Sequence, residues 1–364
     1  MSELTDATIN MGTRILITGG AGFVGSNLAV CHRQEHPEDQ VICLDNLKRP
    51  GSELAPERLE TAGAVFARGD VRSTEDLEAV GAVDLIIDCA AEASVLAGYD
   101  GSPRYLVDTN LNGTFNCLEL ARRHGAGIIF LSSSRIYAIE ALRNLPLEVQ
   151  GDRLAIPAGR TGPGWSDTGI TADFPAIGVR SLYGATKLCS ELLIQEYRAA
   201  YGLHAVINRC GVISGPWQFG QVEQGFVSLW AARHLFQGRL NYIGFGGHGR
   251  QVRDVLHVKD LYDLVRLQIE AMEQYDGEIF NAGGGLDSST SLKELTDLCE
   301  ARTGHSIAID TVPETHPADV PYYVTDNREV TRKTGWKPTR TIPDIVDDIL
   351  QWLKADPERL AGYF

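Results

Sequence analysis

The sequence lacks the features that mark a membrane protein or a nucleic-acid binder. No run of eighteen apolar residues occurs, so we expect no membrane span. The formal net charge of −15 leaves little of the basic surface that nucleic acids and anionic lipids attract. Residues 1–12 are polar, without an apolar signal core, and are expected to form a loose extension. We therefore expect that the protein binds neither a membrane nor a nucleic acid. The net charge is compatible with a local basic pocket for a phosphorylated ligand.

Cysteine is scarce and unpatterned. The seven cysteines are odd in number, scattered, and contain no C-x-x-C pair. This argues against a disulfide framework or a structural zinc site and fits a reducing cytoplasm. His257 has no second histidine or cysteine at metal spacing, so no metal is expected. With 43% hydrophobic and 22% charged residues, the composition is that of a globular protein.

The first half of the chain alternates short apolar runs with longer amphipathic ones. Expected buried strands are residues 14–18, 41–45, 65–69, 85–88 and 128–132, and expected helices are 22–34, 74–80 and 104–123. The strands lack polar alternation, as when helices cover both sheet faces. This order predicts an α/β fold, a Rossmann-type doubly wound parallel sheet over residues 13–205. A smaller C-terminal α/β substrate lobe is expected over 206–364, interleaved with the first.

The second half carries helix signals of its own. Residues 258–274 are amphipathic, and Ser291 has capping-box spacing to Glu294, with Gly304 as the stop. Pro343 suits the first turn of a last helix that ends near residue 353. Between the halves, residues 137–180 form a long interruption rich in Gly, Pro, Thr and Asp from 157 onward. Such a loop is either functional or an ordinary surface excursion.

A glycine-rich turn follows the first strand. Gly19, Gly22 and Gly25 stand where a strand gives way to a helix, the context in which this pattern binds a dinucleotide pyrophosphate. The bland alternative is a generic strand–helix turn. Asp45 ends the second strand, where a carboxylate accepts hydrogen bonds from the adenosine ribose and repels a 2′-phosphate. This favours NAD over NADP, although Lys48 and Arg49 follow closely.

Tyr183 and Lys187 lie four residues apart, which places both on one helical face. An ammonium held there would lower the pKa of the phenol from its usual value near about 10, towards that of a working base. Helices carry such pairs by chance, so the pair indicates a catalytic site only in combination with the nucleotide-binding glycine turn. Together they indicate proton and hydride transfer at a carbinol carbon.

The residues resemble the extended short-chain dehydrogenases/reductases, and specifically the nucleotide-sugar epimerases, over residues 14–352. The motifs that carry the likeness are the glycine turn, Asp45, Gly69-Asp70-Val71-Arg72, Asn110, Ser132-Ser133-Ser134, Tyr183-x-x-x-Lys187 and Asn281-Ala282-Gly283-Gly284. Within this family the chain is most similar to the CDP-paratose (CDP-tyvelose) 2-epimerase group. That likeness lies in Gln218-Phe219, in residues 223–227 and in residues 249–257.

The resemblance implies a set of site residues. Tyr183 would be the acid/base, Lys187 would support its pKa and hold the nicotinamide ribose, and Ser134 would bond the reacting hydroxyl. NAD would be bound by Gly19, Gly22, Phe23, Val24, Gly25, Asp45, Asn46, Asp70, Val71, Ala90, Ala91, Asn110, Tyr183 and Lys187. The nucleotide sugar would be bound by Ser134, Arg135, Gln218 and Arg253, the last at the phosphates, with Arg250 a weaker candidate.

The chain departs from the family pattern at several positions. Pro321 replaces an arginine that often helps bind diphosphate, and Glu92 stands where Gln or His is usual. Cys210-Gly211 differs from the residues expected of a paratose epimerase, and residues 176–180 are inserted before Tyr183. These changes leave the reaction type intact, whereas the sugar nucleotide does not follow from the resemblance.

The expected activity is NAD-dependent epimerisation at C2 of a CDP-paratose-like sugar, in which a hydride leaves the sugar and returns. A C4 epimerase of a UDP-sugar is the main alternative. A 4,6-dehydratase would need an Asp-Glu pair after Ser134, where Arg135 and Ile136 stand. A reductase using NADPH is disfavoured by Asp45, and a non-catalytic dinucleotide sensor could dispense with the tyrosine and lysine. Residues 112–123 and 188–201 match helices through which family members pair, which implies a homodimer.

Overall fold

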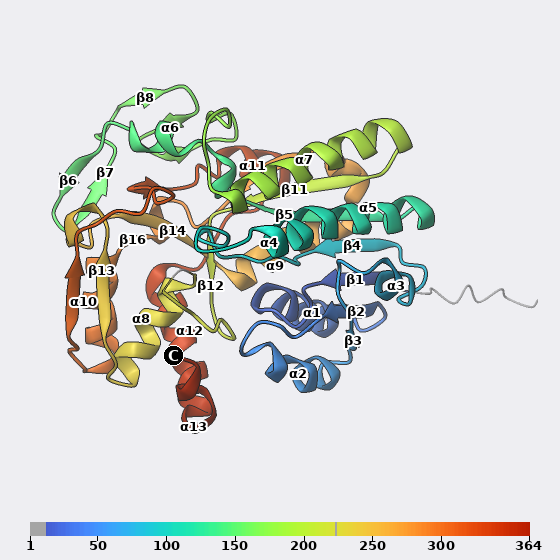
Figure 1. The fold of residues 1–364 in the computed structure, drawn as a ribbon, viewed down its shortest axis with the longest axis horizontal. Helices are drawn as coiled ribbons and strands as arrows, with labels where there is room; N and C mark the ends of the chain where they lie inside the picture. Colours follow the sequence, from blue (N-terminus) through green and yellow to red (C-terminus); the bar gives the residue numbers. More distant parts are fainter. Residues whose placement is uncertain (1–11, 223) are drawn as a thin grey trace, which may run out of the picture.

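The computed structural model describes residues 12–222 and 224–364, so the expected extension lies outside the described residues except for Gly12. Its centre is a seven-stranded sheet in the order β15-β11-β5-β4-β1-β2-β3 (Figure 1). Every neighbouring pair runs parallel. The strands are β1 (Arg14–Thr18), β2 (Gln40–Asp45), β3 (Val65–Arg68), β4 (Leu85–Asp88), β5 (Gly127–Ser133), β11 (Ala205–Cys210) and β15 (Ile279–Ala282). The predicted doubly wound sheet is confirmed.

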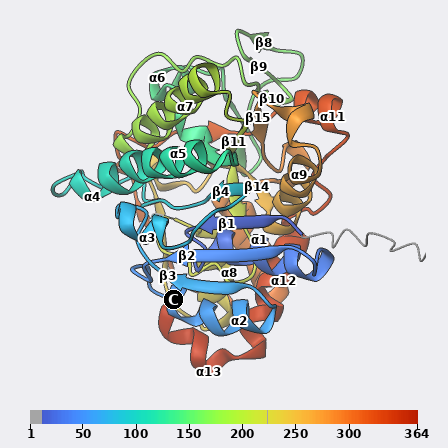
Figure 2. The ribbon, with the colours of Figure 1, turned by 90° about the vertical axis from the view of Figure 1, so that its right-hand side faces the viewer.

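Helices cover both faces of this sheet, as Figure 2 shows. One face carries α1 (Phe23–Glu35), α2 (Ala55–Thr61), α9 (Val258–Glu270) and α11 (Arg328–Thr334). The other carries α3 (Thr74–Glu78), α4 (Arg104–Val107), α5 (Gly113–His124) and α7 (Leu182–Tyr201). Because side chains alternate along a strand, Ile15 and Ile17 enter one core and Leu16 the other. This double burial explains the continuous apolar runs of the sequence.

A second lobe lies beyond the carboxyl ends of the strands. It contains β12 (Val212–Ser214), β13 (Leu240–Ile243), β14 (Val252–His257), β16 (Ser289–Ser291), β17 (Ile309–Val312) and β18 (Tyr322–Tyr323). Its helices are α8 (Phe226–Leu235), α10 (Leu292–Thr303), α12 (Ile342–Ala355) and α13 (Pro357–Leu360). They pack around a separate apolar core that includes Val227, Trp230 and Ile349. Two strands of the central sheet, β11 and β15, nevertheless come from the part of the chain that begins at the expected boundary, residue 205.

The long interruption folds into short elements over the second lobe (Figure 1). These are α6 (Ile139–Arg143), the hairpin of β6 (Glu148–Gln150) and β7 (Arg153–Ala155), and the small sheet of β8 (Thr161–Gly162), β9 (Trp165–Ser166) and β10 (Gly169–Ile170). Ile156, Ile170 and Phe174 are buried with Tyr322 and Tyr323. The segment is thus part of the packed structure. The inserted Ile177 and Val179 are, by contrast, exposed.

Local helix signals are largely confirmed. The Ser291 hydroxyl accepts the Glu294 amide at 3.1 Å in a complete capping box, and Gly304 ends α10 with φ of +73°. Pro343 lies in the first turn of α12, which runs past residue 353 to Ala355. The predicted helix 104–123 instead contains a π-helical segment, Asp108–Asn112, between α4 and α5. No helix among the described residues is long and apolar enough to cross a membrane.

Candidate active site

The glycine turn joins β1 to α1 with very close backbone packing. Gly19 has φ of +61°, and a Cβ atom there would lie 2.9 Å from the Ala90 Cα. A Cβ atom on Gly25 would lie 2.4 Å from the Gly19 carbonyl oxygen. Gly22 caps α1, and its amide donates to the Gly19 carbonyl at 3.0 Å. The turn therefore requires glycine, and it directs the first amides of α1 towards a cavity.

This cavity has a volume of about 330 Å³ and fits the adenosine half of a dinucleotide. Of the residues predicted to bind NAD, eight line it: Gly19, Gly22, Asp45, Asn46, Asp70, Val71, Ala90 and Ala91. Four others, Phe23, Val24, Tyr183 and Lys187, line an adjoining cavity of about 460 Å³. Cys89 and Ala91 line both cavities, so the two meet there. A dinucleotide can thus run from one into the other.

Asp45 is placed to receive a ribose. Its carboxylate already accepts the Leu47 amide at 2.8 Å and the Ala21 amide at 3.1 Å. Burial raises the pKa of the Asp45 carboxyl, and these backbone hydrogen bonds oppose the rise. Asp70 accepts from Asn46 at 2.8 Å and pairs with Arg72, whose hydrogen bonds lower the pKa of Asp70 to about 2. Asp70 therefore orients Asn46 at the cavity wall.

Asn110 is fully buried beneath the site and does not line either cavity. Its side-chain oxygen accepts the Glu92 amide at 2.7 Å, and its side-chain nitrogen donates to the Glu92 carbonyl at 3.0 Å. The same nitrogen reaches Thr186 of α7 at 3.3 Å. Asn110 thus joins the loop after β4 to the helix of Tyr183. The resemblance placed Asn110 among the NAD-binding residues; here its side chain holds the backbone of the loop after β4, and the π-helical segment supplies its position.

Tyr183 and Lys187 lie in the first turns of α7, whose N-terminus is capped by Ser181. The Lys187 ammonium donates to the Leu131 carbonyl at 2.9 Å, over the Phe130 ring. Burial lowers the pKa of Lys187, and the Asp88 carboxylate opposes that change. Burial likewise raises the pKa of Tyr183, against a hydrogen bond from Ser133. The expected lowering of the tyrosine pKa by Lys187 is absent here, because desolvation outweighs the hydrogen bond from Ser133 and the positive charge of Arg135.

The serine that contacts Tyr183 is Ser133. Sequence analysis expected Ser134 to bond the reacting hydroxyl; Ser134 lines the cavity and begins the 3₁₀ turn Ser134–Ile136 after β5. Ser132 points the other way and donates to Glu191. Three consecutive serines give no signal of which one faces the tyrosine, because that depends on where the strand ends. The geometry points to the middle serine.

Glu191 is a buried residue that sequence reasoning missed. Its carboxylate pairs with Arg209 of β11, with Nη2 at 2.8 Å and Nε at 3.1 Å from its oxygens. Arg209 also donates to the Ala172 carbonyl of the long segment at 3.0 Å. Glu191 lies four residues beyond Lys187, so the helical period that linked Tyr183 to Lys187 would have indicated it. This ion pair ties α7 to the sheet beneath the reacting groups.

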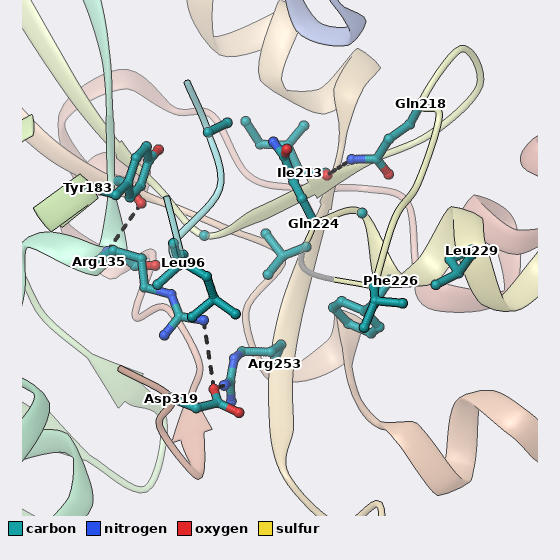
Figure 3. Close-up of a pocket in the computed structure, with 18 of the residues that line it drawn as sticks. Leu96, Arg135, Tyr183, Ile213, Gln218, Gln224, Phe226, Leu229, Arg253 and Asp319 are labelled. Atoms are coloured by element: carbon teal, nitrogen blue, oxygen red, sulfur yellow. Dashed lines mark hydrogen bonds and ion pairs between the residues drawn. The ribbon is translucent and has the colours of Figure 1, made fainter. Parts of the chain in front are cut away.

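Arg135 and Arg253 meet across the second cavity (Figure 3). The Asp319 carboxylate lies 2.9 Å from Arg253 and 3.9 Å from Arg135. Burial lowers the pKa of Arg253 to about 10, Asp319 opposes this, and Arg135 adds to it. Two guanidinium groups share one carboxylate, so the subsite keeps a net positive charge. It is suited to bind an anion.

Gln218 lines the same cavity, but its amide is largely engaged within the lobe (Figure 3). Its nitrogen donates to the Ile213 carbonyl at 2.9 Å. Its oxygen accepts from the hydroxyls of Ser214 and Ser228 at 2.7 and 2.8 Å. One N–H remains for the substrate contact that the resemblance implied, so Gln218 chiefly shapes the cavity wall.

The comparisons with known proteins agree with this geometry. The chain is 28% identical to the CDP-paratose 2-epimerase of Salmonella typhi over 348 residues, which cover 93% of this chain and 98% of that protein. It is 28% identical to the UDP-glucose 4-epimerase of Corynebacterium glutamicum, covering 95% and 97%. It is 29% identical to the dTDP-glucose 4,6-dehydratase of Mycobacterium tuberculosis, covering 83% and 85%.

Solved structures and a family profile complete the comparison. The UDP-glucose 4-epimerase of Thermus thermophilus in complex with NAD superposes with a TM-score of 0.74 at 26% identity, covering 94% of this chain and 99% of that one. The UDP-glucuronic acid 4-epimerase of Bacillus cereus shares the fold, with a TM-score of 0.77 at 22% identity over 94% and 99%. A profile of the NAD dependent epimerase/dehydratase family matches residues 15–283. The chain belongs to this family, and its cofactor is NAD.

Proposed function

We propose that the protein is an epimerase that inverts one carbon of a nucleotide-linked sugar. The observation that carries the proposal is the hydrogen-bonded pair of Tyr183 and Ser133, in the wall of a cavity that adjoins the cofactor cavity. When bound, NAD⁺ supplies the hydride acceptor and donor. Tyr183 takes the proton of the reacting hydroxyl and later returns it, and Ser133 holds that hydroxyl by a hydrogen bond. Lys187, which lines the same cavity, would hold the nicotinamide ribose of the cofactor.

The site lacks the groups that dehydration needs. The two residues after Ser133 are Ser134 and Arg135, and no acidic pair stands there, just as none follows Ser134. Among the described residues that line the substrate cavity, Asp319 is the one carboxylate, and Arg253 holds it. A general acid beside Tyr183 is therefore missing from this set. This supports epimerisation over the 4,6-dehydration of the dehydratase relatives.

The substrate we favour is CDP-paratose or a closely similar sugar nucleotide, with reaction at C2. Arg253 and Arg135 would bind its diphosphate. Polar and apolar side chains line the cavity, and of the apolar ones Leu96 lies near Tyr183, whereas Phe226 lies on the far side (Figure 3). A hydroxyl buried against the wall at Leu96 without a partner costs about 1–3 kcal/mol, whereas the methyl and methylene groups of a 3,6-dideoxyhexose lose nothing. A deoxysugar therefore suits this wall better than a fully hydroxylated hexose.

A C4 epimerase of a UDP-sugar is the second candidate. The same tyrosine and serine could serve either carbon, and the Corynebacterium glutamicum relative has this activity in its name. The test is to incubate the protein with CDP-paratose and with UDP-glucose and to follow each sugar by NMR. We expect inversion at C2 of the first and none at C4 of the second, and loss of that turnover in Tyr183→Phe. A Tyr183→Phe variant that keeps turnover close to the parent would contradict the assignment of the base.

The proposal extends to assembly and location. Phe115 of α5 and Leu192 and Tyr201 of α7 expose 42%, 56% and 58% of their surface on one face of the sheet. An apolar face of this kind suits pairing with a second copy, so we propose a homodimer through α5 and α7. All seven cysteines are free thiols, which suits a cytoplasmic enzyme.

A further inference from the structure

One basic side chain in the cofactor cavity has no assigned role. Arg49 follows β2 and lines the cavity that begins at the glycine turn. Its carbonyl accepts the amide and the hydroxyl of Ser52, which fixes the backbone in a tight turn. That turn abuts the second lobe, since a Cβ atom on Gly51 would lie 2.2 Å from the Phe219 ring. Arg49 is therefore held on a rigid wall.

The guanidinium of Arg49 is available for a ligand. It is half-buried, and it donates no hydrogen bond to any residue in 12–222 or 224–364. The other basic residues of this region are engaged: Arg72 pairs with Asp70 at 2.7 Å, and Lys48 is exposed and lies over the Tyr105 ring. A guanidinium has five N–H donors, and leaving them unpaired at a cavity wall favours an anionic ligand.

The surroundings of Arg49 indicate which part of the cofactor it faces. Burial lowers the pKa of Arg49, and the charge of Glu92, on the loop after β4, opposes this. Glu92 lies two residues beyond Ala90, against which Gly19 packs. Arg49 and Glu92 line the same cavity as Gly19 and Gly22 of the glycine turn, where a pyrophosphate binds. The ribose position belongs instead to the Asp45 carboxylate, which would repel a 2′-phosphate.

We propose that Arg49 is a cofactor-binding residue whose guanidinium hydrogen-bonds the pyrophosphate of bound NAD. In the sequence analysis, Arg49 and Lys48 counted only as groups that could soften the preference for NAD over NADP. In the fold, Arg49 adds a positive charge to the cavity that Gly19 and Gly22 line, which would help retain the cofactor through the reaction cycle. This inference depends on the cofactor and is independent of which sugar is epimerised.

The test compares Arg49→Gln with Lys48→Gln, which removes an equal charge from the adjacent residue. Bound dinucleotide is quantified after denaturation, and NADH affinity is then measured by fluorescence on protein freed of cofactor. We expect Arg49→Gln to weaken NADH binding by about tenfold or more, since charge-assisted hydrogen bonds are lost, and Lys48→Gln to change it by less than about threefold. Circular dichroism and thermal unfolding check that both variants fold.

Fragments of the cofactor locate the contact. In Arg49→Gln, 5′-ADP and ADP-ribose should compete with NADH more weakly by the same factor, while 2′-AMP should be unaffected. Equal losses in the Arg49 and Lys48 variants would show general electrostatic attraction and overturn the proposal. A loss confined to NADPH and 2′-AMP would place Arg49 at the ribose and also overturn it.

Discussion

At the scale of single residues, the question is whether Ser133 or Ser134 bonds the reacting hydroxyl of the substrate. Ser133 contacts Tyr183, whereas Ser134 only lines the cavity. We predict that Ser133→Ala lowers kcat by about 10²-fold or more and leaves NADH binding intact, because one hydrogen bond to the reacting hydroxyl is lost. Ser134→Ala, the matched control, should retain most activity. Steady-state kinetics give kcat for both variants. A larger loss of kcat in Ser134→Ala than in Ser133→Ala would assign the reacting hydroxyl to Ser134.

Asp45 gives a prediction about pH. Burial raises the pKa of its carboxyl, so the neutral form appears at a higher pH than the value of about 3.9 for a free aspartate. The neutral acid is the poorer acceptor for ribose hydroxyls. The dissociation constant for NADH should therefore rise as the pH falls from about 7 to about 5. The Asp45→Asn variant should bind NADH more weakly, and its dissociation constant should not change with pH in this range. The same pH dependence in that variant would show that another group titrates.

At the scale of elements, the glycine turn can be tested through packing. Alanine at position 25 would press its Cβ against the Gly19 carbonyl oxygen, and backbone atoms cannot easily yield. We predict that Gly25→Ala costs about 1–3 kcal/mol of unfolding free energy and weakens NAD binding, because the turn must open. A Cβ atom on Gly101 would meet nothing within 4 Å, so Gly101→Ala should unfold like the parent. Denaturant titration compares the two variants.

The sequence predicted the elements whose signal is local. Strands such as Leu85–Asp88 are short apolar runs, and the capping box at Ser291 is complete within four residues. The π-helical segment Asp108–Asn112 was not predictable, because it reflects contacts of Asn110 with the loop after β4 and with α7. Which of the three serines contacts Tyr183 was not predictable for a related reason. It depends on the strand end and on the approach of Tyr183, which lies far along the chain.

At the scale of the whole molecule, two lobes enclose the reacting groups, and α5 and α7 expose Phe115, Leu192 and Tyr201. We predict that Leu192→Glu converts a homodimer to monomers, since it buries a charge at the proposed interface. Val149 is similarly exposed, at 55%, but lies on β6, in the segment that packs over the second lobe. Val149→Glu should therefore leave the assembly unchanged. Light scattering after gel filtration gives both masses, and a monomeric parent would contradict the proposal.

The central claim is that one sugar carbon loses and regains the same hydrogen within a single site. The most direct measurement uses CDP-paratose deuterated at C2, converted in ordinary water and followed by NMR and mass spectrometry. The account predicts inversion at C2 with the deuterium retained there, and slower turnover if that carbon–hydrogen bond limits the rate. Washout of the label into water, loss of water from the sugar, or inversion at C4 with C2 untouched would contradict it.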